Sequence, residues 1–462
     1  MAMDFSRHLK LFKKDNLPVL LIMVILLALY QAHFFTKFLG ITPSEEVALI
    51  ILLVTAILWV FETIPLFVTS LMVLFLSIIW LLPIMQNAGL GTTKEQFLSA
   101  FFGDITMLFM GGFVLSILLN KYGLARRMAN WMLQRTGEDA SKVMFGIILI
   151  SSFLSMWMSN TATAAMMFAI VGPIMAKLPD TSTFSKGLAI AIPFACNLGG
   201  MGTPIGTPPN AIAIEYLNQK GFDISFIEWM IIAIPLTLIL LILLWRILLI
   251  IFPSKGIKIE VEKKEVQKLS PQQRFVLGLF LLTVFGWLTG GITGLSSGTV
   301  GLMVVIAAFG FGLLNQRDFR NISWDILFML GGGLCLGVGL SQSGLTDTIA
   351  GALPIESGFF IAVMVLMVVA ALMTTFMSNT ATANLLIPVA ISLPQNQLIL
   401  TIVISIMCSS AMALPVSTPP NAVAFGSGML KTKDMLYPGL LVTILSFLLT
   451  LVASFSYIPL FF

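Results

Sequence analysis

Charged residues are scarce in this chain of 462 residues: only 10% are Asp, Glu, Lys or Arg, against about a quarter in soluble domains. Histidine occurs twice and cysteine three times. The histidines, His8 and His33, are terminal or interfacial, so no histidine-based metal site can be built. Cys196, Cys335 and Cys408 lie in apolar segments, and an odd number there fits neither a disulfide framework nor a metal set. The cysteines are predicted to be small packing residues.

Apolar residues make up 58% of the chain, and apolar runs of about 20 residues, long enough to cross a bilayer, recur throughout. The sequence therefore predicts an all-α polytopic membrane protein with about 11 transmembrane helices. The first run is too long for a cleavable signal peptide. The continuous spans are expected near 17–36, 45–62, 65–84, 105–121, 226–252, 275–290, 298–315, 324–345 and 437–460. A basic amphipathic stretch from Arg126 to Lys142 is expected to lie at the membrane interface.

One polar pattern occurs twice in these apolar surroundings. Residues 155–166 are SMWMSNTATAAM and residues 374–385 are TTFMSNTATANL. Each copy is followed by a second shared phrase, GTPPNAIAI at 206–214 and STPPNAVAF at 417–425. The chain is therefore predicted to be an internal duplication: residues 1–44 form a tail and an extra first helix, 45–252 the first repeat, 253–274 a charged linker, and 275–462 the second repeat.

The duplicated phrases lie where the predicted helices are interrupted. Two apolar pieces, 143–158 and 162–176, flank the first SNT and are each too short to cross a membrane comfortably, which predicts a re-entrant hairpin. The second SNT predicts another hairpin over about 357–393. Breaks rich in Gly and Pro, at 197–209 and 414–420, predict broken helices over 187–217 and 397–428. Non-helical backbone at membrane depth is tolerated only where protein or a water-filled cavity satisfies it, so these interruptions predict a binding cavity.

The charges predict the orientation of the chain in the membrane. With the N-terminus inside, 22 of the 25 lysines and arginines fall on the inner side, and only Lys37, Lys94 and Lys220 fall outside. This distribution follows the positive-inside rule. It makes the first repeat begin outside and the second inside, so the repeats are inverted, and the C-terminus is outside.

Inverted repeats with discontinuous helices are typical of secondary transporters with a site near the bilayer midplane. At each break, free carbonyls with Ser and Asn oxygens could hold a small cation such as sodium, and helix N-termini could bind an anion. No Arg, Lys, Asp or Glu lies near SNT or TPPN. A dianionic substrate would then be balanced by helix dipoles and co-bound cations, because burying its charge uncompensated is prohibitive.

The SNT hairpins and TPPN-containing broken helices resemble those of the divalent-anion/sodium symporters, the INDY-type dicarboxylate carriers, from about residue 45 to the end. The resemblance implies sodium-coupled import of C4-dicarboxylates such as succinate, malate and fumarate. It also implies a homodimer in the plasma (inner) membrane, with a scaffold domain and a transport domain that moves by an elevator-type alternating-access mechanism. Sodium ions would be co-transported, with membrane lipid as surroundings and with no organic cofactor, no enzymatic activity and no nucleic-acid partner.

The resemblance also implies site residues, motif position by motif position. The substrate carboxylates would be contacted by Asn160, Thr161, Thr207, Asn379, Thr380, Thr418 and Pro419. One sodium ion would be held by Ser155, Ser159, Asn160 and the Gly206 carbonyl, and the other by Thr374, Ser378, Asn379 and the Ser417 carbonyl. From the fold, the dimer interface is expected on the scaffold, including spans three and four and their repeat mates.

Three alternatives remain open at this point. A dicarboxylate or citrate/succinate exchanger of the same fold would not use sodium and could substitute fixed positive charge, which is absent beside SNT. An ion channel fits paired occluding hairpins less well than alternating access does. An intramembrane enzyme would need a nucleophile with a base, or a metal set, and the apolar core offers neither. The sequence leaves open whether succinate, citrate or sulfate is preferred and how many sodium ions move per cycle.

Overall fold

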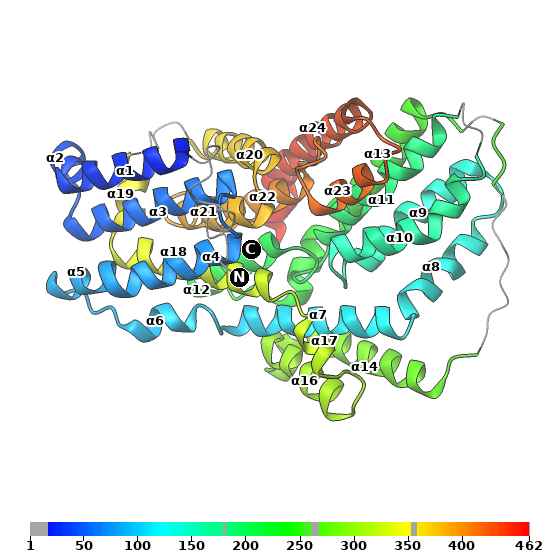
Figure 1. Ribbon diagram of the computed structural model, residues 1–462, viewed down its shortest axis with the longest axis horizontal. Coiled ribbons are helices and arrows are strands. Elements are labelled where there is room, and N and C mark those ends of the chain that lie inside the picture. Colours follow the sequence, from blue (N-terminus) through cyan, green and yellow to red (C-terminus); the bar gives the residue numbers. More distant parts are fainter. Residues whose placement is uncertain (1–16, 179–181, 255, 260–267, 353–357, 462) are drawn as a thin grey trace, which may run out of the picture.

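The computed structural model describes residues 17–178, 182–254, 256–259, 268–352 and 358–461 (Figure 1). The described residues form helices and a single isolated bridge, between Asp139 and Lys258, which confirms the all-α prediction. The basic residues predicted for the tail (Arg7, Lys10, Lys13, Lys14) and part of the linker (Lys255, Lys263, Lys264), together with His8, lie outside the described residues.

The described residues of the first half of the chain form thirteen labelled α-helices, and the second half follows a similar order of elements. The first half comprises α1 (Leu17–Gln31), α2 (Phe34–Leu39), α3 (Pro43–Phe61), α4 (Leu66–Leu76), a π-helical turn (Ser77–Leu81), α5 (Leu82–Asn87), α6 (Lys94–Ser99), α7 (Asp104–Lys121), α8 (Leu124–Arg135), α9 (Ala140–Ser155), α10 (Asn160–Met175), α11 (Phe184–Gly200), α12 (Pro208–Gln219) and α13 (Phe226–Ile251).

The second half comprises α14 (Pro271–Leu288), α15 (Gly290–Thr293), α16 (Ser297–Gly310), α17 (Gln316–Arg320), α18 (Trp324–Gln342), α19 (Leu345–Ala352), α20 (Gly358–Phe376), α21 (Asn379–Ala390), α22 (Gln397–Ser410), α23 (Pro419–Gly426), α24 (Thr432–Ser456) and a 3₁₀ turn (Ile458–Leu460). By order and motif, α7 corresponds to α18, the α9–α10 hairpin to α20–α21, and the broken helix α11/α12 to α22/α23.

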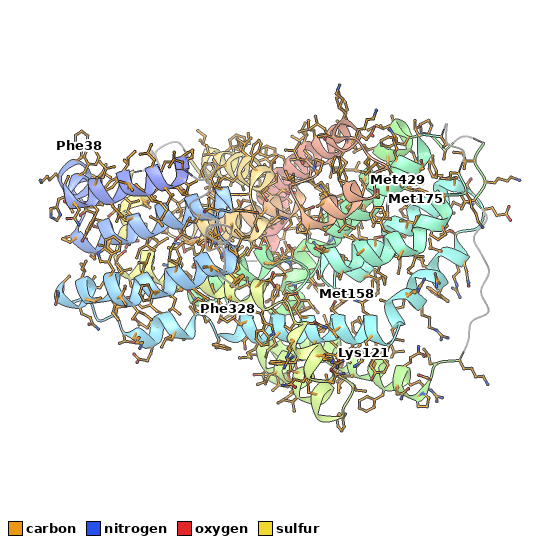
Figure 2. All side chains as sticks on the ribbon, viewed as in Figure 1. Phe38, Lys121, Met158, Met175, Phe328 and Met429 are labelled. Carbon is orange, nitrogen blue, oxygen red and sulfur yellow. The ribbon has the colours of Figure 1, made fainter. Side chains whose placement is uncertain are left out.

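Seven helical segments of the described chain are long and apolar enough to cross a membrane. They are Pro43–Phe61, Leu66–Asn87, Lys94–Lys121, Phe226–Ile251, Trp324–Gln342, Gly358–Phe376 and Thr432–Leu460. The helix breaks predicted from the Gly/Pro-rich loops fall between α11 and α12 and between α22 and α23. Most helices run roughly along the long axis, and Phe38 of α2, 78% exposed, lies at one end of it (Figures 1 and 2).

Local sequence explains where several helices begin. Three helices begin with a reciprocal pair of hydrogen bonds at the N-cap residue, which is Thr42, Ser225 or Ser270. The side chain of the N-cap residue accepts from the backbone N–H of the residue three positions later. The side chain of that third residue accepts from the backbone N–H of the N-cap residue. Such reciprocal capping satisfies two of the N–H groups that a helix start leaves without partners. Since unpaired backbone groups are costly in an apolar setting, these caps fix the helix starts.

Glycines let two pairs of helices approach closely. A Cβ on Gly111 of α7 would lie 2.4 Å from Gly301 Cα of α16, and a Cβ on Gly332 of α18 would lie 2.2 Å from Ser70 Cβ of α4. Small residues at helix contacts are the usual means of association in membranes. Close approach at a glycine therefore occurs in both halves of the chain, at Gly111 and at Gly332.

Helix α18 also receives polar side chains from the hairpin and broken-helix region. Asn384 of α21 lies against Gly333 and donates to Met329 O at 3.3 Å, and Tyr216 of α12 donates to Gly333 O at 3.2 Å. A Cβ on Gly337 would lie 1.7 Å from the Tyr216 hydroxyl. Glycine at these positions is therefore required for α18 to contact α12 and α21 as it does.

Replacing Gly337 with alanine is expected to lower stability by about 1–3 kcal/mol, the usual cost of overpacking a filled interior. Thermal unfolding in detergent micelles measures the loss. Gly278→Ala on α14 is the matched control, because no atom lies within 4 Å of its added Cβ. Equal stability of the two variants would contradict the packing seen at Gly337.

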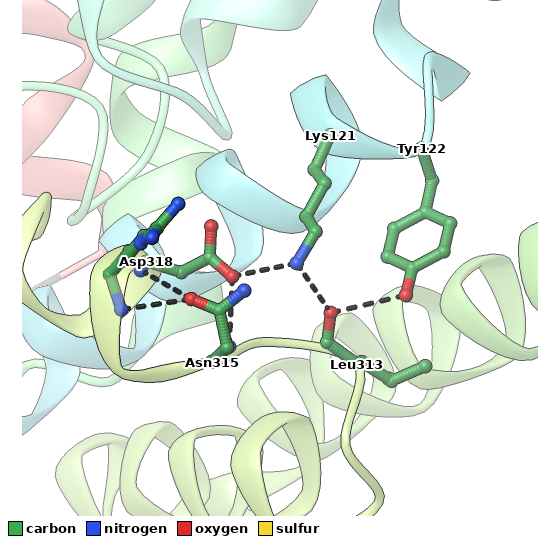
Figure 3. A network of polar contacts seen from close by, with 6 residues as sticks. Lys121, Tyr122, Leu313, Asn315 and Asp318 are labelled. Carbon is green, nitrogen blue, oxygen red and sulfur yellow. Dashed lines mark hydrogen bonds and ion pairs between the residues drawn. The ribbon is translucent and has the colours of Figure 1, made fainter.

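A network of hydrogen bonds and one ion pair connects the end of α7 to residues 313–318, which precede α18 (Figure 3). Lys121 Nζ lies 2.6 Å from Asp318 Oδ2 and donates to Leu313 O at 3.0 Å, and the Tyr122 hydroxyl donates to the same carbonyl at 3.1 Å. Asp318 also accepts from the Asn315 backbone N–H at 2.8 Å. The last residue of α7 is thus tied to the short helix before its counterpart, α18.

The Lys121–Asp318 pair is expected to make stability depend on pH. The hydrogen bond from Lys121 is the largest cause that holds the pKa of Asp318 below its usual value. A lowered carboxyl pKa stabilises the fold above the unfolded-state pKa, about 3.9, and this contribution is lost as pH falls through the folded-state value. For a surface pair the effect is about 0.2–1 kcal/mol. The difference in unfolding temperature between wild type and Asp318→Asn should therefore shrink on acidification from pH 7, and a difference that stays the same at every pH would contradict the assigned pairing.

Candidate functional site

The two hairpin tips are built alike. Ser159 and Ser378 precede α10 and α21 with nearly the same backbone angles, φ −53° and ψ 131° against φ −57° and ψ 135°. Neither serine side chain caps its helix. Met158, next to the first of them, is buried inside the molecule (Figure 2). Each tip therefore presents the start of a helix, with free N–H groups, within the protein interior.

Each tip carries a cluster of three oxygens. Ser155 Oγ lies 2.5 Å from Asn160 Oδ1 and 2.9 Å from Cys196 O. In the second half, Thr374 Oγ1 lies 2.5 Å from Asn379 Oδ1 and 3.0 Å from Cys408 O. One hydroxyl hydrogen cannot serve two acceptors, so each cluster has lone pairs to spare. Neutral oxygens of this kind suit a hard cation.

The loop between α11 and α12 closes on the first cluster. A Cβ on Gly200 would lie 2.8 Å from Asn160 Oδ1 and 3.0 Å from Gly206 O. The Thr203 hydroxyl donates to Met156 O at 2.5 Å, which ties the same loop to the hairpin tip. Three of the predicted ligands of the first sodium ion, Ser155, Asn160 and the Gly206 carbonyl, thus come together, with Ser159 adjacent to Asn160 in the chain.

The second loop reaches its own hairpin in a similar way. Ser417 Oγ lies 3.3 Å from Thr375 O and accepts from the Leu414 backbone N–H at 3.1 Å. Thr375 follows Thr374, so Ser417 is beside the second oxygen cluster. Ser378 precedes Asn379 at the start of α21. The predicted ligands of the second sodium ion therefore also gather in one region.

Two buried asparagines donate hydrogen bonds to backbone carbonyls of the broken-helix loops. The sequence alone predicts no role for them. Asn210 Nδ2 donates to Gly200 O, Met201 O and Thr203 O at 3.0, 3.2 and 2.8 Å. Asn421, the counterpart, donates to Met412 O and Leu414 O, both at 3.0 Å. Each is the last residue of a TPPN motif and is fully buried, and each binds backbone carbonyls at the helix break, where buried polar groups need partners. We call the two asparagines the TPPN braces.

Hydrogen bonds between the repeats join the two broken helices. Asn197 Nδ2 donates to Thr418 Oγ1 at 3.0 Å and lies 3.3 Å from Asn421 Oδ1, and Ser405 Oγ donates to Asn210 Oδ1 at 3.0 Å. Helix α12 also packs on α21 and α22, and α23 packs on α10 and α11. Each TPPN brace is therefore held by the other repeat. Because Asn197 and Ser405 belong to neither repeated phrase, no sequence signal identified them.

The side chains predicted to contact the substrate differ in which hydrogen-bonding groups they already use within the protein. Asn160 and Asn379 use only their amide oxygens, and the side chains of Thr161, Thr207 and Thr380 make no hydrogen bond within the described chain. The Thr418 hydroxyl accepts from Asn197 and from the Asn421 backbone N–H, and its own hydrogen is not used in either bond. Pro419 is exposed. The asparagines and the four threonines thus have donors available for an anion.

None of the groups that contact the two oxygen clusters in the described part of the chain is charged. The ion pairs there join His33 with Glu46, Lys121 with Asp318, and Lys186 with Asp434. No group of three or more His, Cys, Asp or Glu that could hold a metal occurs among the described residues. The three cysteines are buried and unpaired, which confirms them as packing residues.

Comparisons with known proteins agree with this geometry. A family model described as a citrate transporter matches residues 56–403. A sodium-dependent dicarboxylate transporter, SdcS, of Staphylococcus aureus is 30% identical over 87% of this chain and 84% of its own. Its namesake from Staphylococcus saprophyticus is 29% identical over 95% of this chain and 90% of its own. The solved YdaH transporter of Alcanivorax borkumensis has a similar fold, with a TM-score of 0.53 at 14% identity, over 79% of this chain and 88% of that one.

The family match covers most of the chain, and the relatives align along nearly their whole length. The described helices include seven able to span a bilayer, and the site is made of neutral oxygens without catalytic groups. The protein is an integral membrane transporter and not an enzyme, and it belongs to the divalent-anion/sodium symporter family.

Proposed function

We propose that the protein is a sodium-coupled symporter that imports C4-dicarboxylates such as succinate, malate and fumarate. The observation that carries the proposal is the matched pair of oxygen clusters, at Ser155 with Asn160 and at Thr374 with Asn379. The names of the SdcS relatives, sodium-dependent dicarboxylate transporters, support both the cation and the substrate class. The substrate is small and dianionic, and no organic cofactor takes part.

The asparagine amides provide the physical basis of coupling. The Oδ1 atoms of Asn160 and Asn379 belong to the oxygen clusters, while their Nδ2 atoms make no hydrogen bond within the described chain. A sodium ion on the oxygen polarises the amide and orients its N–H groups toward a substrate carboxylate. The N-termini of α10 and α21 add partial positive charge at the same places. The cations thus complete the anion site, and neither species binds well alone.

The proposed ligand sets are those that the family resemblance implies. One sodium ion is held by Ser155, Ser159, Asn160 and the Gly206 carbonyl, and the other by Thr374, Ser378, Asn379 and the Ser417 carbonyl. The Cys196 and Cys408 carbonyls join these sets because they contact Ser155 and Thr374. The substrate contacts Asn160, Thr161, Thr207, Asn379 and Thr380, with Thr418 and Pro419 beside them.

Transport is assigned to an elevator-type motion of one body against another. The moving body comprises the hairpins, the broken helices, α13 and α24, which interlock across the repeats. The scaffold comprises α3–α7 and α14–α18, joined by the α7–α16 and α4–α18 contacts, and carries the homodimer interface. Asn384 and Tyr216 would then slide along α18 during the cycle.

The N-terminus is assigned to the cytoplasm and the C-terminus to the outside of the plasma (inner) membrane, with inverted repeats. Contacts between distant segments support this threading. Lys121 pairs with Asp318, and Lys186 pairs with Asp434. The charge pattern puts all four of these residues on the inner side.

Uptake of labelled succinate into proteoliposomes tests the function. An inward sodium gradient is expected to drive uptake, and replacing sodium with choline is expected to abolish it. Uptake that ignores sodium but requires dicarboxylate inside the vesicle would instead identify a sodium-independent dicarboxylate or citrate/succinate exchanger. Competition by malate, fumarate, citrate and sulfate sets the substrate range.

A further inference from the structure

A large cavity lies beside the first hairpin, between the amphipathic helix α8, the hairpin arm α9, and helices α13 and α14. Its volume is about 920 Å³, at the upper end of the range of about 300–1,000 Å³ for small-molecule sites. These helices lie in the same half of the molecule (Figure 1). Neither oxygen cluster lines it, so the site already described does not account for this space.

The walls of the cavity are apolar along the helices that would face the bilayer. Phe153 of α9, Leu238 of α13 and Leu277 of α14 line it, and the first two are 41% and 46% exposed. Exposed side chains of this kind favour contact with hydrocarbon. The cavity therefore suits an acyl chain better than a water-soluble metabolite.

One wall of the cavity is cationic. Arg126 and Arg127 of α8 line it together with the polar side chains of Asn130 and Gln273, and none of its 19 lining residues is acidic. Neither arginine forms an ion pair within the described chain. An occupant with a negatively charged headgroup would meet both guanidinium groups without competition from a carboxylate.

Helix α8 has the further features of a helix at the membrane interface. Its buried face is Leu124, Ala125, Ala129 and Leu133. Trp131 lines the cavity and is 46% exposed, and the Arg135 guanidinium lies 4.1 Å from the centre of its ring. Tryptophan and basic residues concentrate at the level of lipid headgroups, so the cationic wall is at the depth where a headgroup would be.

We infer that this cavity binds a phospholipid with an anionic headgroup, whose phosphate contacts Arg126 and Arg127 and whose acyl chain lies among α9, α13 and α14. The lipid bridges α9 and α13, which are assigned to the moving body, and α14, which is assigned to the scaffold. At its inner end the cavity reaches Met156, the neighbour of Trp157, whose ring packs 5.7 Å from Phe280 of α14. Lipid in this cavity therefore adds to the contact between the first hairpin tip and α14.

The second repeat is different at the corresponding place. Phe376, which corresponds to Trp157 in the repeated phrase, is 71% exposed, whereas Trp157 is 7% exposed. Helix α19, the counterpart of α8, packs on α18, α21 and α3 and not along α20 as α8 packs along α9. The lipid site thus belongs to the first repeat alone, and the duplication in sequence does not predict it.

Native mass spectrometry of the purified full chain tests the inference. The protein is reconstituted in nanodiscs of phosphatidylcholine and phosphatidylglycerol and then transferred to mild detergent. Wild type is expected to retain phosphatidylglycerol in preference to phosphatidylcholine. Each basic residue near an anionic surface contributes roughly fivefold to affinity, so Arg126→Gln with Arg127→Gln should reduce this preference about 30-fold.

Two further variants make the result decisive. Arg317→Gln with Arg320→Gln removes two arginines from α17, which does not line the cavity, and should retain lipid as wild type does. Leu277→Trp fills the apolar end and should reduce retention of both lipids, with unfolding temperature in phosphatidylcholine as the check on folding. Equal retention of the two lipids by wild type, or wild-type retention by the α8 double variant, would overturn the inference. The measurement requires neither substrate nor sodium, so it is independent of the proposed transport function.

Discussion

Replacing Asn160 or Asn379 with alanine is expected to lower sodium-dependent succinate uptake by about 10- to 150-fold. Each change removes one amide that we assign to both a sodium ion and a substrate carboxylate. A hydrogen bond to a charged group is worth about 1.5–3 kcal/mol, and each 1.36 kcal/mol is tenfold. Initial rates in proteoliposomes at subsaturating substrate measure the loss, and the near-identity of the two tips predicts losses of similar size.

Asparagine-to-aspartate changes separate the two roles of the amide. Aspartate keeps the oxygen of the cluster but replaces the free Nδ2 donor with a negative oxygen. The half-saturating succinate concentration should therefore rise far more than the half-saturating sodium concentration. Asn120→Ala, at an exposed position on α7, is the matched control and should transport normally. Normal uptake by both alanine variants would refute the assigned site.

Replacing Asn210 or Asn421 with alanine is expected to destabilise the protein by about 1–3 kcal/mol, the usual cost of one unsatisfied buried group. The lost amide leaves Gly200 O or Met412 O without a partner, whereas Met201 O, Thr203 O and Leu414 O keep bonds from the Trp229 side chain and from backbone N–H groups. The change also breaks the contacts with Ser405 or Asn197 that join the two halves of the chain. Thermal unfolding in detergent measures the loss, and because each change leaves one carbonyl unpaired, the two variants should lose similar amounts of stability.

Aspartate again separates the explanations at these positions. Asn210→Asp has nearly the same size and shape, but it cannot donate to the carbonyls of Gly200, Met201 and Thr203. It should be at least as destabilising as alanine if hydrogen bonding is what matters. An aspartate variant as stable as wild type would show that the asparagine only fills space. It would refute the assignment of Asn210 as a hydrogen-bonding brace.

Much of the architecture was predictable because apolar runs and interruptions leave a direct trace in a membrane sequence. The two SNT phrases mark the hairpin tips, and the Gly/Pro-rich runs at 197–209 and 414–420 contain the helix breaks. Backbone groups at membrane depth have no water to bind, so a helix can stop there only where special residues provide for it. For that reason the positions of Asn160 and Asn379 at helix starts followed from the sequence.

The partners of those residues could not be predicted, because they come from distant and unremarkable segments. The Cys196 and Cys408 carbonyls complete the oxygen clusters, yet any residue type could supply them. Asn197 and Ser405 reach across the repeats to the TPPN braces, and no repeated phrase contains them. Backbone carbonyls carry no sequence signature, and contacts between repeats depend on how the helices pack.

The sequence by itself determined an all-α membrane protein with a duplicated, uncharged polar site, because apolar length, charge scarcity and repeated motifs are properties of the chain. Only the tertiary structure decided which groups meet at that site and where the halves differ. Trp157 is buried against α14, while Phe376 in the same phrase is exposed. Two similar stretches acquire different surroundings because each packs against whatever helices the remainder of the fold brings to it.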